Sequence, residues 1–289
     1  MLNTISKMNT YITSPIENSS DKAIQNDIFA QLIAWSNSLE VPIFLSLKED
    51  TIQKIISYFS SGRKGSVTIG LAGETASGKS TITNSLITAF KKYEQNLGLS
   101  DFITKVNIDD YYYDRSEMVK AAGSFDKFVE NYDLDSPSAF ELTLLANHLA
   151  LLKAGRSVYL PKYDMSGTAK RYDNVTLANP SKIIVAEGLY TFNEQINESF
   201  DIKIYVDIDE DIQKTRWYRR AKERDLGDSA DRVYTNALEK AKIYIRPTKA
   251  NADIIINGEA RIADYDIFFE KLTDILTKIN SKERKALPV

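Results

Sequence analysis

The chain has 289 residues, which is enough for one α/β domain with an extension or for two small domains, and its 43% hydrophobic content supports a sizeable core. Its 37 basic and 40 acidic residues nearly cancel, so a net charge of −3 gives no bulk attraction to nucleic acid or membranes. With no cysteine and one histidine, disulfides and thiolate metal sites are excluded, and a Ser-His-Asp hydrolase is nearly excluded. No stretch reaches the ~18 apolar residues of a membrane span, and no signal pattern opens the chain, so we expect a cytoplasmic protein.

Residues 1–62 are predicted to form an arm and a helical extension. Residues 1–25 are rich in Ser, Thr and Asn and have few apolar anchors, which is typical of a mobile or loosely packed segment. Apolar spacing then predicts amphipathic helices over residues 26–39 and 47–59, which either cover the outside of the domain or bind a partner. A Ser-, Gly- and Lys-rich break follows, and residues 63–289 are expected to form the main domain.

The next stretch, VTIGLAGETASGKST, contains the pattern G-x-x-x-x-G-K-S between an apolar strand and a helix. Gly73 and Gly78 allow a tight turn and a close approach of the backbone to a phosphate. Backbone N–H groups and the helix N-terminus attract the anion, Lys79 supplies a positive charge, and the Ser80 hydroxyl is a ligand for Mg²⁺. The pattern predicts a bound nucleoside triphosphate. The residues expected to contact it are Gly73, Glu74, Thr75, Ala76, Ser77, Gly78, Lys79, Ser80 and Thr81.

Strands and helices alternate through the rest of the chain. Apolar runs predict strands at residues 102–108, 157–160, 182–186, 202–206 and 252–256. Helices are predicted at residues 79–96, 137–154, from 211 onward, 229–244 and 265–279. The only histidine, His148, lies on or beside an apolar helix face, where we expect a packed, hydrogen-bonded side chain. The order of elements predicts an α/β three-layer sandwich of the P-loop NTPase type with a mainly parallel sheet.

Acidic residues follow two of the predicted strands. Asp109 and Asp110 come directly after one strand, and Glu187 comes directly after another. Ligands of open α/β sheets bind outside the carboxyl ends of the strands, so these side chains should face the nucleotide. Transfer of a phosphoryl group to an alcohol needs a base, for which Asp109 is the first candidate and Asp110 the second. Ser80, Glu187 and Asp109 are the candidate ligands of Mg²⁺, which needs only one or two carboxylates.

A long helix in the last third of the chain carries four arginines. Arg216, Arg219 or Arg220, and Arg224 fall on one stripe at spacings of three and four. We expect these arginines to form a lid that closes over the triphosphate and neutralises the charge that develops during transfer, with Arg216 and Arg220 as catalytic candidates. The alternative is a solvated helix face.

Six motifs follow one another between residues 67 and 259. They are the GETASGKST loop, Asp109-Asp110-Tyr111-Tyr112, Asn131-Tyr132-Asp133 with Ser136-Pro137-Ser138-Ala139-Phe140, Pro161-Lys162-Tyr163-Asp164, Ala186-Glu187-Gly188, and Pro247-Thr248-Lys249 with Ala252-Asp253-Ile254-Ile255-Ile256. Together they resemble the motifs of the uridine kinase and phosphoribulokinase family of P-loop kinases, most closely those of its uridine–cytidine kinases.

This resemblance implies ATP or GTP as the phosphate donor, Mg²⁺ as a cofactor, and the 5′-hydroxyl of a pyrimidine nucleoside such as uridine as the acceptor, in pyrimidine salvage. In this family an aspartate holds the ribose hydroxyls and a tyrosine contacts the base. The residues implied are Asp109 as base, Ser80 and Glu187 around Mg²⁺, Tyr112, Asp133 and Tyr163 at the acceptor, and Arg216 in the lid. No nucleic-acid or membrane partner is implied, and such kinases are often homo-oligomers.

The sequence departs from the family pattern in three places. The family histidine that touches the pyrimidine corresponds to a position near Thr168. Leu134 and Asp135 are inserted in the Asp-His-Pro motif, so either Asp133 or Asp135 could contact the sugar. The lid also lacks the usual Gly-Arg pair. Two alternatives therefore remain: a related kinase acting on a sugar phosphate, pantothenate or glycerate, and a nucleotide-binding regulatory NTPase with slow hydrolysis.

Overall fold

The computed structural model of the chain describes residues 22–59, 65–223 and 227–286. Within these ranges its centre is a six-stranded sheet with the order β1-β8-β7-β2-β6-β3. Neighbouring strands are parallel except β1 and β8 at one edge, which are antiparallel. The strands are β1 (Phe44–Leu47), β2 (Val67–Gly73), β3 (Ile103–Asn107), β6 (Ile183–Glu187), β7 (Ile202–Asp207) and β8 (Ile254–Asn257).

β2 lies in the middle of this sheet and is buried along its whole length. Its aliphatic residues face helices on both sides, as expected for a parallel strand that is covered on both faces. β2 pairs in register with β6 and β7, and β3 and β8 flank these strands. The parallel strands therefore point their carboxyl ends to one edge, where β7, β2, β6 and β3 end at Asp207, Gly73, Glu187 and Asn107 respectively.

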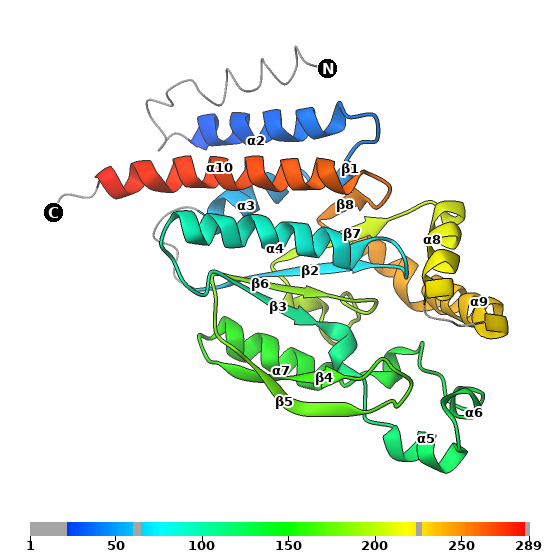
Figure 1. Cartoon of the computed structure of the whole chain (residues 1–289). Helices are drawn as coiled ribbons and strands as arrows, with labels where there is room; N and C mark the ends of the chain where they lie inside the picture. The colour runs from blue at the N-terminus through cyan, green and yellow to red at the C-terminus, as the bar shows by residue number, and fades with distance from the viewer. Residues whose placement is uncertain (1–21, 60–64, 224–226, 287–289) are drawn as a thin grey trace.

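Helices cover both faces of the sheet, so the structure has three layers (Figure 1). The helices on one face are α2 (Lys22–Asn37), α3 (Thr51–Phe59), α4 (Lys79–Asn96) and α10 (Ile262–Ala286). Their apolar side chains form one core cluster with those of the sheet. On the other face, α7 (Leu142–Lys153) forms a second core cluster. The predicted α/β three-layer sandwich with a mainly parallel sheet is confirmed.

The N-terminal segment adds one strand to the sheet and two helices to the covering layer. β1 pairs with β8, and Phe29 of α2 belongs to the same core cluster as α4 and α10. The sequence pattern does not reveal β1, because its four residues are partly exposed and show no alternation. The helix predicted from Leu47 is therefore wrong at its start, since α3 begins at Thr51. The arm predicted over residues 1–25 is wrong at its end, because residues 22–25 belong to α2. The rest of that arm and the boundary at residue 62 lie outside the described residues.

A two-stranded antiparallel sheet and two short helices form a small lobe beside the main sheet (Figure 1). Its elements are α5 (Ser116–Ala122), α6 (Phe125–Val129), β4 (Val158–Tyr163) and β5 (Arg171–Ala178). The predicted strand at residues 157–160 covers only the first half of β4. The polar stretch that follows turns back as β5, which is exposed over most of its length and therefore lacks an apolar pattern.

The helix predicted to follow Ser136 begins later. Pro137–Ala139 forms a 3₁₀ turn in which the Ser138 N–H donates to the Ser136 hydroxyl, and α7 starts at Leu142. Phe140, between the two, is extended and forms a β-bridge with Tyr112. This pairing with a distant segment interrupts a helix that local sequence would continue.

Two helices, α8 (Glu210–Glu223) and α9 (Ala230–Lys240), lie at the carboxyl edge of the sheet (Figure 1). A π-helical segment (Ala241–Ile245) and a 3₁₀ segment (Arg246–Asn251) connect α9 to β8. The helix predicted over 229–244 thus changes its form after Lys240. Among the described residues, no helix combines the length and the apolar character that crossing a membrane requires.

Candidate active site

The phosphate-binding loop turns from β2 into α4 at the carboxyl edge of the sheet. Gly73 has a φ of +149°, and a Cβ there would lie 2.5 Å from the Val206 carbonyl oxygen, so only glycine fits. Gly78, with a φ of +99°, precedes α4 in the left-handed conformation that favours glycine. No side chain of the described residues caps the N-terminus of α4. The first N–H groups of this helix can therefore bind an anion.

Lys79, the first residue of α4, folds back over the loop. Its Nζ donates hydrogen bonds to the carbonyl oxygens of Gly73 (2.9 Å) and Glu74 (2.7 Å). Burial lowers the pKa of Lys79 to about 8, although the nearby carboxylates of Glu187 and Asp109 oppose this shift. A phosphate in the loop would meet a buried amine that two carbonyl groups hold in place.

The side chains of Ser80, Glu187 and Asp109 place oxygen atoms beside the loop. The Ser80 hydroxyl donates to Glu187 Oε2 at 3.1 Å, and Lys105 Nζ lies 3.3 Å from Glu187 Oε1. Asp109 lies in a 3₁₀ turn directly after β3, and its Oδ1 is buried without a hydrogen-bond partner among the described residues. Burial, followed by the charge of Glu187, raises the pKa of Asp109 to about 6, against the opposing effect of Lys79.

This set of oxygen ligands fits Mg²⁺. The ion prefers oxygen ligands, retains several waters, and takes one or two carboxylates together with substrate phosphates. Ser80, Glu187 and the unpartnered Oδ1 of Asp109 offer one hydroxyl and two carboxylates. Across the described ranges, no three His, Cys, Asp or Glu side chains are grouped so that they could hold a metal on their own. The site is therefore suited to an ion that arrives with a nucleotide.

Asp110 makes different contacts from its neighbour. Its carboxylate accepts the backbone N–H of Tyr163 (3.2 Å) and forms an ion pair with Lys162 Nζ at 3.1 Å. These contacts join the turn after β3 to β4. Because Asp109 has a buried carboxylate oxygen without such a partner, it is favoured over Asp110 as the candidate base.

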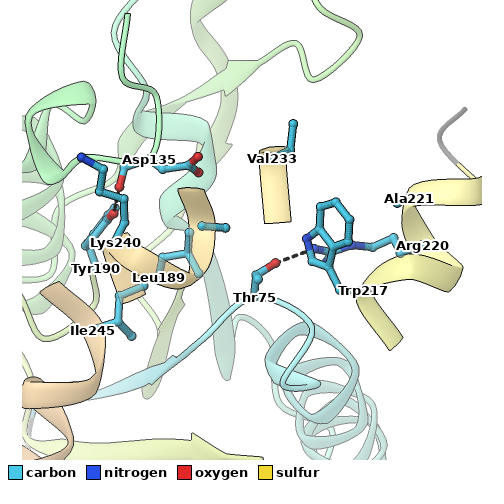
Figure 2. Close-up of a pocket in the computed structure, with 11 residues that line it drawn as sticks. Thr75, Asp135, Leu189, Tyr190, Trp217, Arg220, Ala221, Val233, Lys240 and Ile245 are labelled. Carbon is cyan, nitrogen blue, oxygen red and sulfur yellow. Dashed lines mark hydrogen bonds between the residues drawn. The ribbon is translucent and has the colours of Figure 1, made fainter. Parts of the chain in front are cut away.

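α8 places two arginines against the loop. Arg216 Nη1 donates to a carbonyl oxygen of the segment after β8 (2.7 Å), and Arg220 Nη2 donates to Thr75 Oγ1 (2.5 Å). Figure 2 shows the Arg220 side chain extending from α8 to Thr75. Arg219 is exposed, and Arg224 lies outside the described residues. Of the predicted stripe, Arg216 and Arg220 are the pair that faces the loop.

Two residues that the sequence pattern does not single out hold the loop against its neighbours. Arg246 Nε donates to Glu74 Oε1 at 2.6 Å. Gln213 Nε2 donates to Glu74 Oε2 (3.2 Å) and to the Thr75 carbonyl oxygen (3.0 Å). The Glu74 side chain, predicted to contact nucleotide, is thus engaged in holding the loop. The position of Arg246 directly before the Pro-Thr-Lys motif could have indicated a role at the site, whereas nothing in the sequence indicates one for Gln213.

A cleft of about 700 Å³ opens between the small lobe and α9. Tyr112, Asp133 and Tyr163, the residues predicted to contact the acceptor, all line it. The rings of Tyr112 and Tyr163 have centroids 4.8 Å apart and form an aromatic wall. The structure therefore brings the three predicted acceptor residues to one space, although they come from distant parts of the chain.

A smaller cavity of about 160 Å³ lies between this cleft and the phosphate-binding loop. Thr75 and Arg220 border it on the loop side, and Tyr190, Asp135 and Lys240 border it on the opposite side (Figure 2). Asp135 and Lys240 line both spaces, so the two adjoin. The cleft and the cavity together extend from the small lobe to Thr75 of the loop.

Asp133 and Asp135, the two alternatives for a sugar contact, have different partners. Asp133 Oδ2 pairs with Lys240 Nζ at 2.5 Å, and its Oδ1 accepts the backbone N–H of Asp135 at 3.0 Å. Asp135 Oδ2 accepts a hydrogen bond from Asn236 Nδ2 (2.7 Å), while the Tyr190 hydroxyl donates to its backbone oxygen. Burial raises the pKa of Asp135. No sequence pattern predicts that Asn236 and Lys240, both on α9, contact these two aspartates.

His148 lies in α7, on the covering layer of the sheet. Its Nδ1 is 2.9 Å from the Tyr111 hydroxyl, and burial lowers its pKa. The prediction of a packed, hydrogen-bonded histidine is confirmed.

Comparison with known proteins agrees with this arrangement. The phosphoribulokinase/uridine kinase family matches residues 68–264 of the chain. A uridine kinase of Clostridium perfringens is 34% identical over 223 residues, which cover 74% of this chain and 99% of that relative. A uridine kinase of Limosilactobacillus reuteri is 33% identical over 222 residues, which cover 74% of this chain and 94% of that relative.

The fold is also similar to that of the D-glycerate 3-kinase from Cryptococcus neoformans var. grubii. The TM-score is 0.50 at 15% sequence identity, with 74% of this chain and 96% of that chain covered. At this identity the likeness concerns the fold alone. The family match spans most of the chain and includes the loop, both strand-end carboxylates and α8. The chain therefore belongs to the phosphoribulokinase/uridine kinase family, and it is a kinase that phosphorylates an alcohol group.

Proposed function

We propose that this kinase transfers the γ-phosphate of ATP or GTP to the 5′-hydroxyl of a pyrimidine ribonucleoside, uridine or cytidine. Relatives named uridine kinase match nearly their whole length to this chain, which supports the assignment. The loop would hold the triphosphate through its N–H groups and Lys79, and Arg216 and Arg220 would balance the negative charge of the phosphates. Phosphoryl transfer depends mainly on such positioning and charge.

Asp109 is the proposed base. Its buried carboxylate oxygen has no partner among the described residues, and a pKa raised to about 6 matches a base that works near neutral pH. It would accept the proton of the attacking hydroxyl as the new oxygen–phosphorus bond forms. Ser80 and Glu187, with Asp109 beside them, would hold Mg²⁺, which would neutralise phosphate charge when bound.

The charge of the acceptor cleft is the observation that favours a nucleoside over the other acceptors. Among its described lining residues, five side chains are acidic: Asp126, Glu130, Asp133, Asp135 and Asp164. Two are basic, Arg232 and Lys240, and Lys240 is paired with Asp133. A sugar phosphate, pantothenate or glycerate carries a negative charge that this cleft would repel. A neutral nucleoside avoids that cost, and its hydroxyls can donate to carboxylates.

Within the cleft we assign the sugar to Asp135 rather than Asp133. Both carboxylate oxygens of Asp133 have partners, one of them the Lys240 ammonium, whereas Asp135 also borders the cavity that leads to the loop. The Tyr112 and Tyr163 rings offer a flat surface for a base. Thr168, near the family histidine position, donates its hydroxyl to Asp164 at 2.7 Å, so base recognition would depend on other groups.

An acceptor screen with the purified full-length chain tests the proposal. ADP release is measured with ATP and Mg²⁺ in the presence of uridine, cytidine, pantothenate, glycerate or ribulose 5-phosphate. We expect rapid turnover with uridine or cytidine and a 5′-monophosphate as the product. Faster turnover with an anionic acceptor would replace the proposed substrate class. Slow hydrolysis that no acceptor stimulates would indicate a regulatory NTPase instead.

The same proposal makes the protein a cytoplasmic enzyme of pyrimidine salvage that needs no nucleic-acid or membrane partner. Its relatives' names and its acceptor chemistry support this, since free nucleosides and ATP are soluble substrates. We also propose a homo-oligomer. Light scattering coupled to size-exclusion chromatography measures the mass of the particle, and a mass of one chain would reject that part.

A further inference from the structure

Lys105, on β3, contacts one of the proposed metal ligands although the nucleotide and acceptor sites do not include it. Its Nζ lies 3.3 Å from Glu187 Oε1 and donates to Asn84 Oδ1 at 3.2 Å. Glu187 Oε2 accepts the Ser80 hydroxyl at 3.1 Å. The two oxygens of the Glu187 carboxylate therefore have different partners, one cationic and one neutral.

These four side chains form a closed ring that includes one turn of α4. Ser80 and Asn84 are four residues apart in the helix and so point to the same side of it. The ring runs from Ser80 through Glu187 and Lys105 back to Asn84. β3 and β6 pair directly, with Asn107 opposite Glu187, so the sheet backbone fixes the separation of the lysine and the carboxylate. Contacts at both oxygens hold the carboxylate in one orientation, although its last torsion is otherwise broad.

The burial of the Glu187 carboxylate explains why a cation is needed beside it. The Glu187 side chain is 5% exposed and the Lys105 side chain 32% exposed. A carboxylate in a buried position is unfavourable unless a charge or hydrogen bonds compensate it, and Asp109 adds a second negative charge nearby. Lys79 and Lys105 together balance these two carboxylates. Because Lys105 itself reaches solvent, its replacement should not open a cavity in the core.

We propose that Lys105 is a positioning residue that orients Glu187, so that Oε2 faces Ser80 where both would hold Mg²⁺. The inference rests on the proposed metal-dependent phosphoryl transfer. Loss of a group that orients a metal ligand typically weakens metal binding about 10- to 100-fold. Lys105→Met keeps an unbranched side chain but removes the ammonium. It should therefore weaken metal binding about 10-fold or more and leave metal-free nucleotide binding unchanged.

Mn²⁺ is a suitable probe, because electron paramagnetic resonance measures its binding directly. The full-length chain is titrated with Mn²⁺ in the presence of a non-hydrolysable ATP analogue and without an acceptor. Lys105→Arg keeps a cation at the ion pair and should retain most of the affinity. Lys92→Met removes a lysine from an exposed ion pair with Glu270 and should bind Mn²⁺ like the parent. Asn84→Ala removes the second anchor of the ammonium and should cause a smaller loss than Lys105→Met.

Equal or tighter Mn²⁺ binding by folded Lys105→Met overturns the proposal. If Lys105→Met does not fold, Lys105→Arg and Asn84→Ala test the proposal in its place. Parent-like Mn²⁺ affinity of Asn84→Ala together with weak Mn²⁺ binding by Lys105→Arg would then contradict the ring. A failure of the metal site itself appears separately, because Ser80→Ala and Glu187→Gln would then leave Mn²⁺ binding unchanged. No acceptor is present, so the outcome does not depend on which alcohol the enzyme phosphorylates.

Discussion

Asp109→Asn separates the chemical role of this carboxylate from its effect on the fold. The amide has nearly the same shape, but it cannot take the proton of an attacking alcohol. Loss of a positioned general base lowers kcat about 10²- to 10⁴-fold, and we expect kcat with uridine to fall by this factor. ATP binding should change little, because the loop would hold the phosphates through its N–H groups and Lys79.

The pKa of Asp109 adds an expectation for pH dependence. The base acts only when it is deprotonated, so kcat/KM for the acceptor should rise with pH, reach half its maximum near the pKa of about 6 and level off above it. The residual activity of Asp109→Asn should lack this step. The step is read from kcat/KM measured across the pH range with the parent and the variant in parallel.

The same pKa predicts that the variant is more stable than the parent. Folding raises the pKa of Asp109 from its ordinary 3.8 to about 6, so the ionised carboxylate destabilises the folded chain at pH values above 6. A shift of roughly two pH units corresponds to about 3 kcal/mol at most. Because Asp109 is partly exposed as a residue, we expect a gain in unfolding free energy of about 1–3 kcal/mol at pH 8. The gain should shrink as the pH falls below 6 and be mostly lost near pH 4, where the folded state is protonated and the unfolded state is about half protonated.

Urea unfolding at pH 8 and pH 4 measures these free energies, and coupled ADP release measures kcat. Asp110→Asn is the matched control, because that carboxylate contacts Lys162 and the Tyr163 backbone. The control should lose stability and retain more activity than Asp109→Asn. A variant at position 109 with parent-like kcat, or with lower stability than the parent at pH 8, would refute the reasoning about a strained buried base.

Three further sets of substitutions test the loop, the lid and the acceptor cleft. Lys79→Ala should lower kcat/KM about 10²- to 10³-fold by removing the buried amine from the phosphates, and a parent-like value in the ADP-release assay would contradict this. Arg220→Ala should lower kcat about 10-fold or more with little change in KM, whereas the exposed Arg219→Ala should behave like the parent; equal kcat losses would reject the assigned stripe. Asp135→Asn should reduce kcat/KM more for uridine than for 2′,3′-dideoxyuridine, and Asp133→Asn should not. The reverse order would assign the sugar contact to Asp133.

The phosphate-binding loop and its helix could be predicted because their determinants are close together in the chain. Glycines at both ends, a lysine and a serine stand within nine residues, and the α4 bounds agree with the prediction. Asp109 and Glu187 could be selected for a related reason. In a parallel sheet every strand points its carboxyl end to the same edge, so residues that follow different strands are brought near one another without any knowledge of their contacts.

Elements without a strong apolar pattern were not predictable. β1 has four residues, β5 is largely exposed, and Phe140 interrupts a helix because it pairs with Tyr112 far away in the chain. The partners of the loop show the same limit. Gln213 and Arg246 contact Glu74 because α8 and the segment after α9 pack at the carboxyl edge.

The sequence by itself determined that this chain has a nucleotide-binding loop, a mainly parallel sheet and carboxylates at the active edge, because each follows from residue types and their spacing along one or two elements. The tertiary structure decided the contacts of close neighbours: Asp110 pairs with Lys162 whereas Asp109 Oδ1 has no partner among the described residues, and Arg220 contacts Thr75 whereas Arg219 is exposed. Asp133 and Asp135 likewise have different partners. The physical reason is that such neighbours are alike in sequence. Only the groups that distant elements place beside them determine whether a carboxylate is committed to an ion pair or an arginine reaches the loop.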